Sequence, residues 1–278
     1  MNTLPKLSWG EPSDQQPIYF AHANGFPPSS YQPIIDALAE QREVVSYLQR
    51  PLWQPTPDPG DLKNWQQLAD DVIAFFDQNN MKNVVAVGHS LGSVTAFMAA
   101  QKRPDLFKAL VMIEPVAFSR WFCGLIKVMP WLFKKRVPII KKALNRPDHF
   151  NDIQAAFDFH RRPRVFKRIN DAHLWHYIRA AFYQQSSGDV RLVFPRDWEA
   201  HIYATVGHFR NQLLKSKLPI LAMRGSRTDT LSAKFWSKWK TNQNHQFVDF
   251  PNNGHLLPLE NSGAVIESLL PFVEQHLS

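Results

Sequence analysis

Short, mostly apolar runs alternate along the chain with longer segments in which apolar residues recur every three or four positions. Runs of the first kind are typical of strands buried in a parallel sheet, and the longer spacing is typical of helices that bury one face. The alternation predicts an α/β fold, a mostly parallel sheet with helices on both faces. The expected strands are residues 18–21, 43–47, 84–87, 109–113, 218–224 and 245–250, and the expected helices include 31–41, 65–78 and 235–240. Residues 1–17 are expected to form no element.

The pattern changes between residues 117 and 217, where no strand-like run of this kind occurs. This stretch is rich in aromatic residues and holds 19 Lys and Arg against 7 Asp and Glu, in a chain whose net charge is +8. Such a charge asymmetry indicates a separate unit with its own surface. We therefore expect a separate helical unit at 117–217, inserted into a core made of residues 1–116 and 218–278.

The segment NVVAVGHSLGSVTAF, residues 83–97, carries the clearest chemical signal, a G-x-S-x-G pattern centred on Ser90. It follows an expected strand and precedes an expected helix, which is the context of a nucleophilic serine on a tight turn. The backbone is crowded there, so Gly88 and Gly92 fit because they lack side chains. The N–H of Leu91, at the helix start, would face a developing negative charge.

On these residues the chain resembles the α/β-hydrolase fold family of serine hydrolases, in its esterase-like and lipase-like members with an inserted helical cap. The resemblance implies an oxyanion loop before the nucleophile, then an acid, then a histidine. His22-Ala23-Asn24-Gly25-Phe26 matches the H-x-x-G-F form of that loop. The second oxyanion donor would be the N–H of Asn24 or of Phe26, and His22 is expected to hold the loop by hydrogen bonds.

The resemblance also implies an acid and a general base in the second part of the chain. Asp229 lies a few residues past the 218–224 run, where the family usually places its acid, and Glu114, after the 109–113 run, is the rival. We expect Asp229 to be the acid, so that Asp229→Asn abolishes most turnover and Glu114→Gln does not. His255 follows Gly254 after the last apolar run and fits the general base.

Together these residues imply acyl transfer to water without a cofactor. His255 would take the proton of Ser90, whose oxygen attacks a carbonyl carbon. The expected substrate is a carboxylic ester with an apolar acyl group. A serine nucleophile argues against the dehalogenases and epoxide hydrolases, which use an aspartate. The same triad would serve a lid-gated lipase, a thioesterase or a carbon-carbon bond hydrolase, and a non-catalytic ligand-binding protein on this fold is a further alternative.

Composition limits the compartment and the partners. The lone Cys123 cannot form an internal disulfide, and no apolar segment near the start resembles a signal peptide, so a cytoplasmic protein is expected. No metal-ligand spacing and no nucleic-acid motif occurs, so neither partner is expected. Residues 121–140 mix aromatic and basic residues. They would contact a membrane or lipid surface, or else pack on the core with their lysines solvated.

Overall fold

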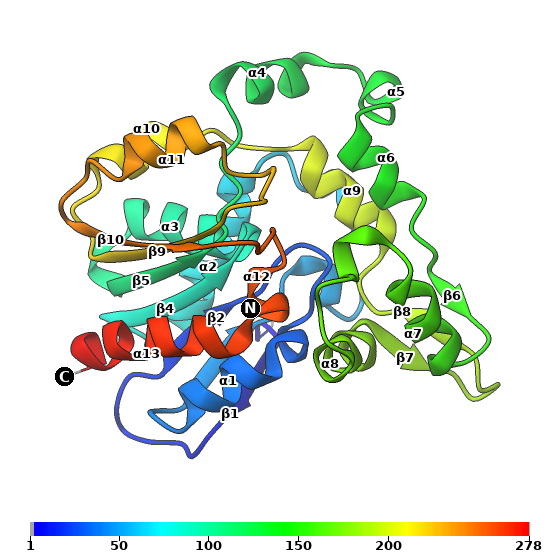
Figure 1. Cartoon of the computed structure of the whole chain (residues 1–278), viewed down its shortest axis with the longest axis horizontal. Coiled ribbons are helices and arrows are strands. Elements are labelled where there is room, and N and C mark those ends of the chain that lie inside the picture. The colour runs from blue at the N-terminus through cyan, green and yellow to red at the C-terminus, as the bar shows by residue number, and fades with distance from the viewer. Residues whose placement is uncertain (1–2, 278) are drawn as a thin grey trace.

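The structure, a computed structural model, describes residues 3–277 and contains a central seven-stranded sheet (Figure 1). The strand order is β1-β3-β2-β4-β5-β9-β10, and every pairing is parallel except that of β1 with β3. The predicted α/β fold with a mostly parallel sheet is therefore confirmed. The strands are β1 (Lys6–Trp9), β2 (Ile18–Ala21), β3 (Val44–Tyr47), β4 (Val84–His89), β5 (Phe107–Ile113), β9 (Ile220–Gly225) and β10 (His245–Phe250).

Helices cover both faces of this sheet, because alternate strand residues point to opposite sides. In β4, Val84 and Ala86 join one hydrophobic cluster, whereas Val85 and Val87 join the other. The first cluster includes residues of α2 (Trp65–Gln78), α3 (Leu91–Lys102) and α11 (Ala233–Trp239). The second includes residues of α1 (Gln32–Ala39), α12 (Leu257–Glu260) and α13 (Ser262–Leu277).

The expectation that residues 1–17 form no element is wrong, because β1 lies within them; Met1 and Asn2 are outside the described residues. Three of the four β1 residues are exposed, so the segment has no apolar run to reveal it. Antiparallel pairing with β3, with Lys6 opposite Tyr47, makes it an edge strand. Residues 6–9 are a strand because of long-range backbone hydrogen bonds with β3, and a local sequence pattern does not record such bonds.

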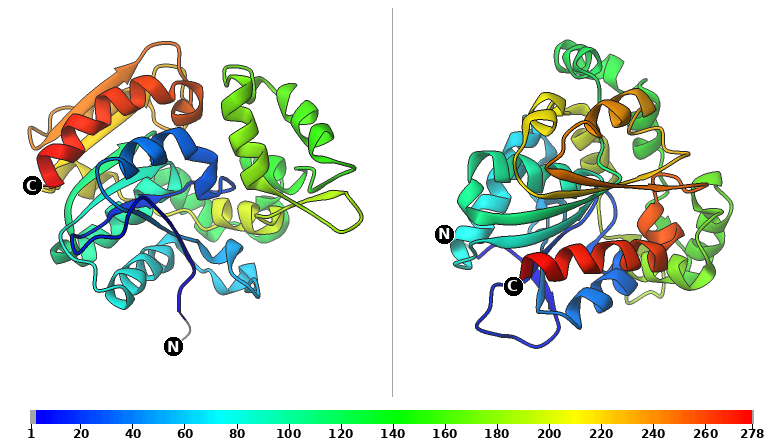
Figure 2. Two further views of the ribbon diagram at one scale, coloured as in Figure 1. Left: turned by 90° about the horizontal axis from the view of Figure 1, so that it is seen from below. Right: turned by 60° about the vertical axis from the view of Figure 1, so that its left-hand side comes forward.

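The residues between β5 and β9 form a second layer of structure, which lies beside the central sheet and its helices in Figure 2. The sequence suggested that this layer is helical throughout. The structure differs, because the layer also contains a three-stranded antiparallel sheet in the order β6-β8-β7. Strands of two or three residues are too short for a hydrophobic period to predict. The elements are α4 (Arg120–Val128), α5 (Trp131–Lys134), α6 (Pro138–Leu144), β6 (His149–Phe150), α7 (Ile153–Arg161), α8 (Asp171–Ala181), β7 (Phe182–Gln184), β8 (Val190–Leu192), α9 (Arg196–Ala204) and α10 (Arg210–Lys215).

The parallel sheet brings the chemically interesting loops together. The carboxyl ends of β2, β4, β5, β9 and β10 lie at one edge of the sheet, where open α/β sheets place their ligand sites. The loops that leave these ends carry the residues singled out above, from His22 to His255.

Candidate active site

Ser90 occupies a strained turn between β4 and α3. Its φ is +53°, a left-handed conformation that a serine adopts only under constraint. A Cβ on Gly88 would lie 2.6 Å from the backbone nitrogen of Ser93, and one on Gly92 would lie 2.1 Å from the carbonyl oxygen of Ala21. Both glycines therefore allow close backbone packing around the serine, as the sequence predicted. Ser90 is 6% exposed.

His255 lies against the serine hydroxyl. Its Nε2 is 2.9 Å from Ser90 Oγ, so the imidazole can accept the hydroxyl proton. The backbone is fixed as well, because His89 Nε2 donates to the carbonyl oxygen of His255 at 2.9 Å. Burial, followed by the charge of His255, lowers the pKa of His89 well below its ordinary value, which keeps His89 neutral. The structure thus brings the predicted nucleophile and general base together.

Glu114 is the carboxylate beside that histidine. It directly follows β5 and is fully buried, and its Oε2 is 3.3 Å from His255 Nδ1. The same carboxylate accepts hydrogen bonds from the backbone N–H of Gly225 and from the hydroxyl of Thr228. Thr230 Oγ1 lies 2.9 Å from His255 Nδ1, so a hydroxyl and a carboxylate both face this nitrogen.

The expectation that Asp229 is the acid does not hold in the structure. Asp229 is exposed, and within residues 3–277 it makes no hydrogen bond or ion pair with His255. Its neighbours Thr228 and Thr230 point toward Glu114 and His255 instead. The loop after β9 therefore supplies hydroxyls to the site, and the carboxylate comes from the end of β5. Sequence reasoning missed both threonines, whose only signal was their place around Asp229.

Two backbone N–H groups next to the expected site, one after β2 and one after its neighbour β4, have no acceptor among residues 3–277. In the described part of the chain, neither the N–H of Leu91 nor that of Asn24 donates a hydrogen bond. The N–H of Phe26, by contrast, donates to the carbonyl oxygen of Ala23 at 3.3 Å and closes a turn. Between the two donors that the sequence left open, the hydrogen bonding favours Asn24.

His22 holds this loop, as predicted. Its Nε2 accepts from the backbone N–H of Gln49 at 3.2 Å, and its Nδ1 donates to the carbonyl oxygen of Ala23 at 3.0 Å. The side-chain amide of Gln49 donates to the carbonyl oxygen of His22 at 2.7 Å. Burial lowers the pKa of His22 to about 4, which matches the neutral tautomer that this bonding requires.

A buried ion pair packs against the other side of the 22–26 loop. Arg146, which follows α6, donates from Nη1 to Glu199 Oε2 on α9 at 2.6 Å, and both side chains are largely buried. Gly25 lies directly beneath them with a φ of +76°. A Cβ on Gly25 would lie 3.0 Å from Arg146 Nη1 and from the carboxylate of Glu199. Nothing in the sequence pattern marked this pair, because its members are 53 residues apart.

The flanking residues of the loop touch the same layer. The amide of Asn24 donates to the carbonyl oxygen of Glu199 at 3.0 Å, and the ring of Phe26 lies 4.8 Å from that of Tyr177 on α8. We call residues 22–26 the oxyanion loop. Contacts of His22 with the segment after β3, and of the next residues with α8, α9 and the segment after α6, fix its backbone between the two layers.

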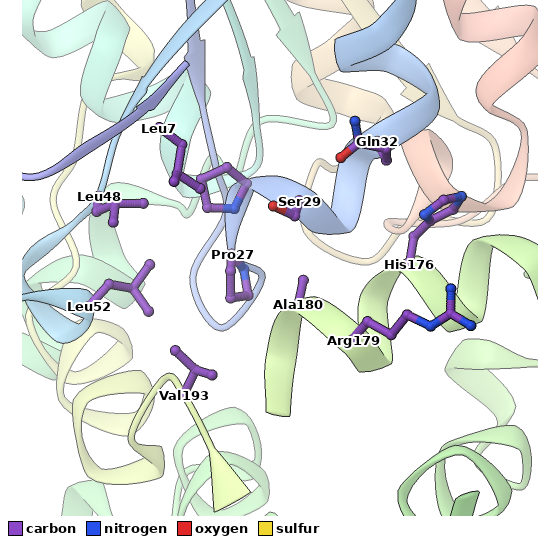
Figure 3. A pocket seen from close by; sticks show the side chains of 11 residues that line it. Leu7, Pro27, Ser29, Gln32, Leu48, Leu52, His176, Arg179, Ala180 and Val193 are labelled. Carbon is purple, nitrogen blue, oxygen red and sulfur yellow. The ribbon is translucent and has the colours of Figure 1, made fainter. Parts of the chain in front are cut away.

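A cleft of about 430 Å³ lies beside this region but is a different place (Figure 3). It is open to solvent between the segment around Pro27 and helix α8, with an apolar end and a polar end (Figure 3). Neither Ser90 nor Glu114 nor His255 lines it. The apolar end includes Leu7, Leu48, Leu52 and Val193, and the polar end includes Ser29, Gln32, His176 and Arg179.

Two other classes of feature, a membrane-spanning helix and a metal cluster, are not found among residues 3–277. No helix among them is long and apolar enough to cross a bilayer. No three His, Cys, Asp or Glu side chains in this range gather closely enough to hold a metal ion.

The sequence matches a family model described as the alpha/beta hydrolase family over residues 18–268. Similar curated proteins match a shorter stretch. Karrikin insensitive 2 receptor IA of Petunia hybrida is 29% identical over 105 residues, which are 37% of this chain and 38% of that protein. Strigolactone esterase RMS3 of Pisum sativum is 27% identical over 106 residues, 37% and 40% of the two chains. A putative esterase/lipase of Haemophilus influenzae is 30% identical over 105 residues, 34% and 37% of the two chains.

Solved structures resemble the whole chain at low identity, and so share its fold. E-2-(acetamidomethylene)succinate hydrolase superposes with a TM-score of 0.77 at 17% identity, covering 98% of this chain and 95% of that one. The peroxisomal alpha-beta-hydrolase Lpx1 of Saccharomyces cerevisiae superposes with a TM-score of 0.74 at 17% identity, covering 100% and 90% of the two chains.

Proposed function

The chain belongs to the alpha/beta hydrolase family, and from that premise we propose that it is a serine hydrolase that cleaves a carboxylic ester. The proposed nucleophile is Ser90, the general base is His255 and the acid is Glu114. The proposed oxyanion donors are the backbone N–H groups of Leu91 and Asn24.

One observation carries the proposal, the continuous chain of contacts from hydroxyl to imidazole to buried carboxylate. Ser90 Oγ lies 2.9 Å from His255 Nε2, and Glu114 Oε2 lies 3.3 Å from His255 Nδ1. A carboxylate at Nδ1 keeps the proton on that nitrogen, which leaves Nε2 free to accept the serine proton. It also stabilises the imidazolium that forms when the proton moves.

The reaction then follows from these positions. As Ser90 Oγ bonds to the substrate carbonyl carbon, its proton passes to His255, and the carbonyl oxygen becomes an oxyanion between the N–H groups of Leu91 and Asn24. One such donor typically stabilises the transition state by about 3 kcal/mol. His255 gives its proton to the departing alkoxide, which leaves as the alcohol. Water, deprotonated by His255, releases the acid from the acyl-enzyme.

The ester is the preferred substrate class because several similar proteins are named esterases, among them strigolactone esterase RMS3. Structural neighbours at low identity include proteins named as an enol-lactonase and as a thioesterase domain. The triad would also serve a lipase, a thioesterase or a carbon-carbon bond hydrolase. A non-catalytic binding protein is the competing class, since some relatives are named receptors; the presence of all three side chains favours an enzyme.

The proposal also covers the division into domains and the cellular compartment. Residues 117–217 would act as a cap over a core of residues 1–116 and 218–278, because cap residues Arg146 and Glu199 contact the oxyanion loop. The cytoplasm is the proposed compartment, because Cys123 is a buried free thiol, and unpaired thiols are usual where the medium is reducing.

Hydrolysis of p-nitrophenyl esters from acetate to palmitate tests this function. We expect turnover by the wild type and a loss of roughly 10³-fold or more in Ser90→Ala. Ser237→Ala, an exposed serine on α11, is the matched control and should leave the rate unchanged. If the folded wild type hydrolyses no ester or thioester and a fluorophosphonate fails to label Ser90, the binding-protein class replaces the enzyme.

A further inference from the structure

Helices α4 and α5 expose an unusual number of large apolar side chains. Trp121 is 76% exposed, Val128 is 77% exposed and Leu132 is 66% exposed. A soluble protein normally scatters such residues singly, and a contiguous group of them marks an interaction surface. Residues 121–133 hold such a group within one short stretch of chain, here called the α4–α5 surface, which consists of Trp121, Leu125, Val128, Trp131, Leu132 and Phe133.

The α4 part of this surface is fixed in its outward direction. Trp121, Leu125 and Val128 are spaced by four and three residues, so they lie on one face of the helix. Cys123 and Ile126 are buried on the other face and belong to the core cluster. Figure 1 and the right-hand view of Figure 2 show α4 at the outer edge of the molecule, away from the central sheet. The apolar face is therefore presented to the outside by a helix that is anchored from behind.

The part of the chain that carries this surface has charges of one sign. Residues 117–144 contain seven Lys and Arg and no Asp or Glu. Lys135 lies 5.7 Å from the centre of the Trp131 ring, and Arg136 lies 5.7 Å from that of Phe133, so cations border the apolar side chains directly. Two copies of this surface would repel each other, which argues against a second chain as the occupant. An anionic partner is attracted to it.

From these observations we propose that the α4–α5 surface docks the protein onto bilayers that contain anionic lipids. Tryptophan favours the boundary between headgroups and acyl chains, because its ring is apolar and its N–H is polar. Lysine and arginine at the same depth bind lipid phosphates, and such amphipathic helices lie in the plane of the interface. A helix that lies in the plane of the interface contacts one face of the bilayer, so the proposed attachment is peripheral. This inference does not depend on the proposed hydrolysis.

Vesicle flotation with the full chain tests the docking without a substrate, so its result is separate from that of the ester assay. We expect binding to vesicles of phosphatidylcholine with 30% phosphatidylglycerol and at least tenfold weaker binding to phosphatidylcholine alone. Raising NaCl from 0.1 to 0.5 M should weaken the binding to the anionic vesicles several-fold, because salt screens the exposed charges. Equal binding to both vesicles, or binding to neither, would overturn the proposal.

Surface variants locate the contact. Trp121→Ser should reduce the partition coefficient at least fivefold, whereas Tyr183→Ser, half-exposed on β7, should not change it. Lys127→Gln combined with Lys135→Gln should reduce it in the same way, and Lys234→Gln with Lys238→Gln, exposed on α11, is the matched control. Wild-type binding by both test variants contradicts the assignment. A dimer in light scattering that Trp121→Ser dissociates, with no vesicle binding, would identify a second copy as the occupant instead.

Discussion

At the scale of single residues, the proposed chemistry depends on where one buried carboxylate is held. Glu114 has a φ of +48°, a left-handed conformation that costs of order 1 kcal/mol or more in a residue with a side chain. Hydrogen bonds from Gly225 and Thr228 to its carboxylate hold the side chain in place, and a third contact goes to His255. The strained backbone thus aims a charge at the imidazole.

We expect Glu114→Gln to lower kcat for p-nitrophenyl acetate by roughly 10³ to 10⁴-fold with little change in KM. The amide has almost the same shape but no charge, and its NH₂ group would hold His255 in the tautomer that cannot accept the serine proton. Steady-state kinetics of the purified variant, with circular dichroism to establish folding, measure the effect.

Asp229→Asn is the matched comparison, because it also replaces a carboxylate by an amide, in the loop after β9, the strand next to β5. Asp229 is exposed, and the described structure shows no hydrogen bond or ion pair between it and His255. The kcat of Asp229→Asn should therefore stay within a few-fold of the wild-type value. A large loss in Asp229→Asn with a small one in Glu114→Gln would reverse the assignment of the acid.

At the scale of elements, the oxyanion loop is a short connection held from two directions. Hydrogen bonds with Gln49 hold its first residue, His22, on the central sheet, and the Arg146 and Glu199 pair of the second layer packs on Gly25. A buried ion pair contributes little net stability, but it is costly to disturb once formed. The position of the Asn24 N–H therefore depends on contacts made by both layers.

We expect Gly25→Ala to lower kcat by about 10 to 100-fold while the protein stays folded. A methyl group there would lie 3.0 Å from Arg146 and Glu199 in a residue with a φ of +76°, so the loop must shift and move the Asn24 N–H. The measurement is kcat and KM for one p-nitrophenyl ester.

Gly124→Ala is the control, since a Cβ at this α4 position would meet nothing within 4 Å among the described residues, apart from its chain neighbours and the backbone of its own helix. This substitution should leave kcat unchanged and stabilise the helix slightly. Wild-type activity in Gly25→Ala would mean that the loop does not set the position of an oxyanion donor.

At the scale of the whole molecule, stability depends on histidines that are buried without charge. Burial lowers the pKa values of His22, His160 and His245 to about 4 each, the first cause in every case being desolvation of the cation. The same side chains titrate near 6.5 when the chain is unfolded. Between these two values the unfolded chain binds protons that the native protein does not.

The free energy of unfolding should therefore fall as the pH is lowered from about 6.5 to about 4, and change little with these groups above 7. For His22 the loss is of order 3 kcal/mol across that window, at about 1.4 kcal/mol for each unit of pKa difference. Urea unfolding at pH 7.5, 6.0, 5.0 and 4.5 measures it. His22→Gln should flatten the dependence, and an equally steep curve in that variant would exclude His22 as a contributor.

The sequence by itself determined the parts of this protein that depend on neighbouring residues. Buried strands such as 84–87 and the amphipathic helix α2 are encoded by local hydrophobic spacing. The turn around Ser90 is marked locally as well, because two glycines stand within five residues of sequence, at Gly88 and Gly92.

Only the tertiary structure decided which distant groups meet. Glu114 and Asp229 both follow strands that are neighbours in the sheet, so sequence order could not distinguish them. The loop after β9 turns Thr228 and Thr230 toward the histidine and leaves Asp229 in solvent. The sequence also did not predict the edge strand β1 or the pairing of Arg146 with Glu199, because both depend on residues far apart in the chain. Side-chain direction and long-range pairing depend on the packing of the whole chain, and no local pattern records them.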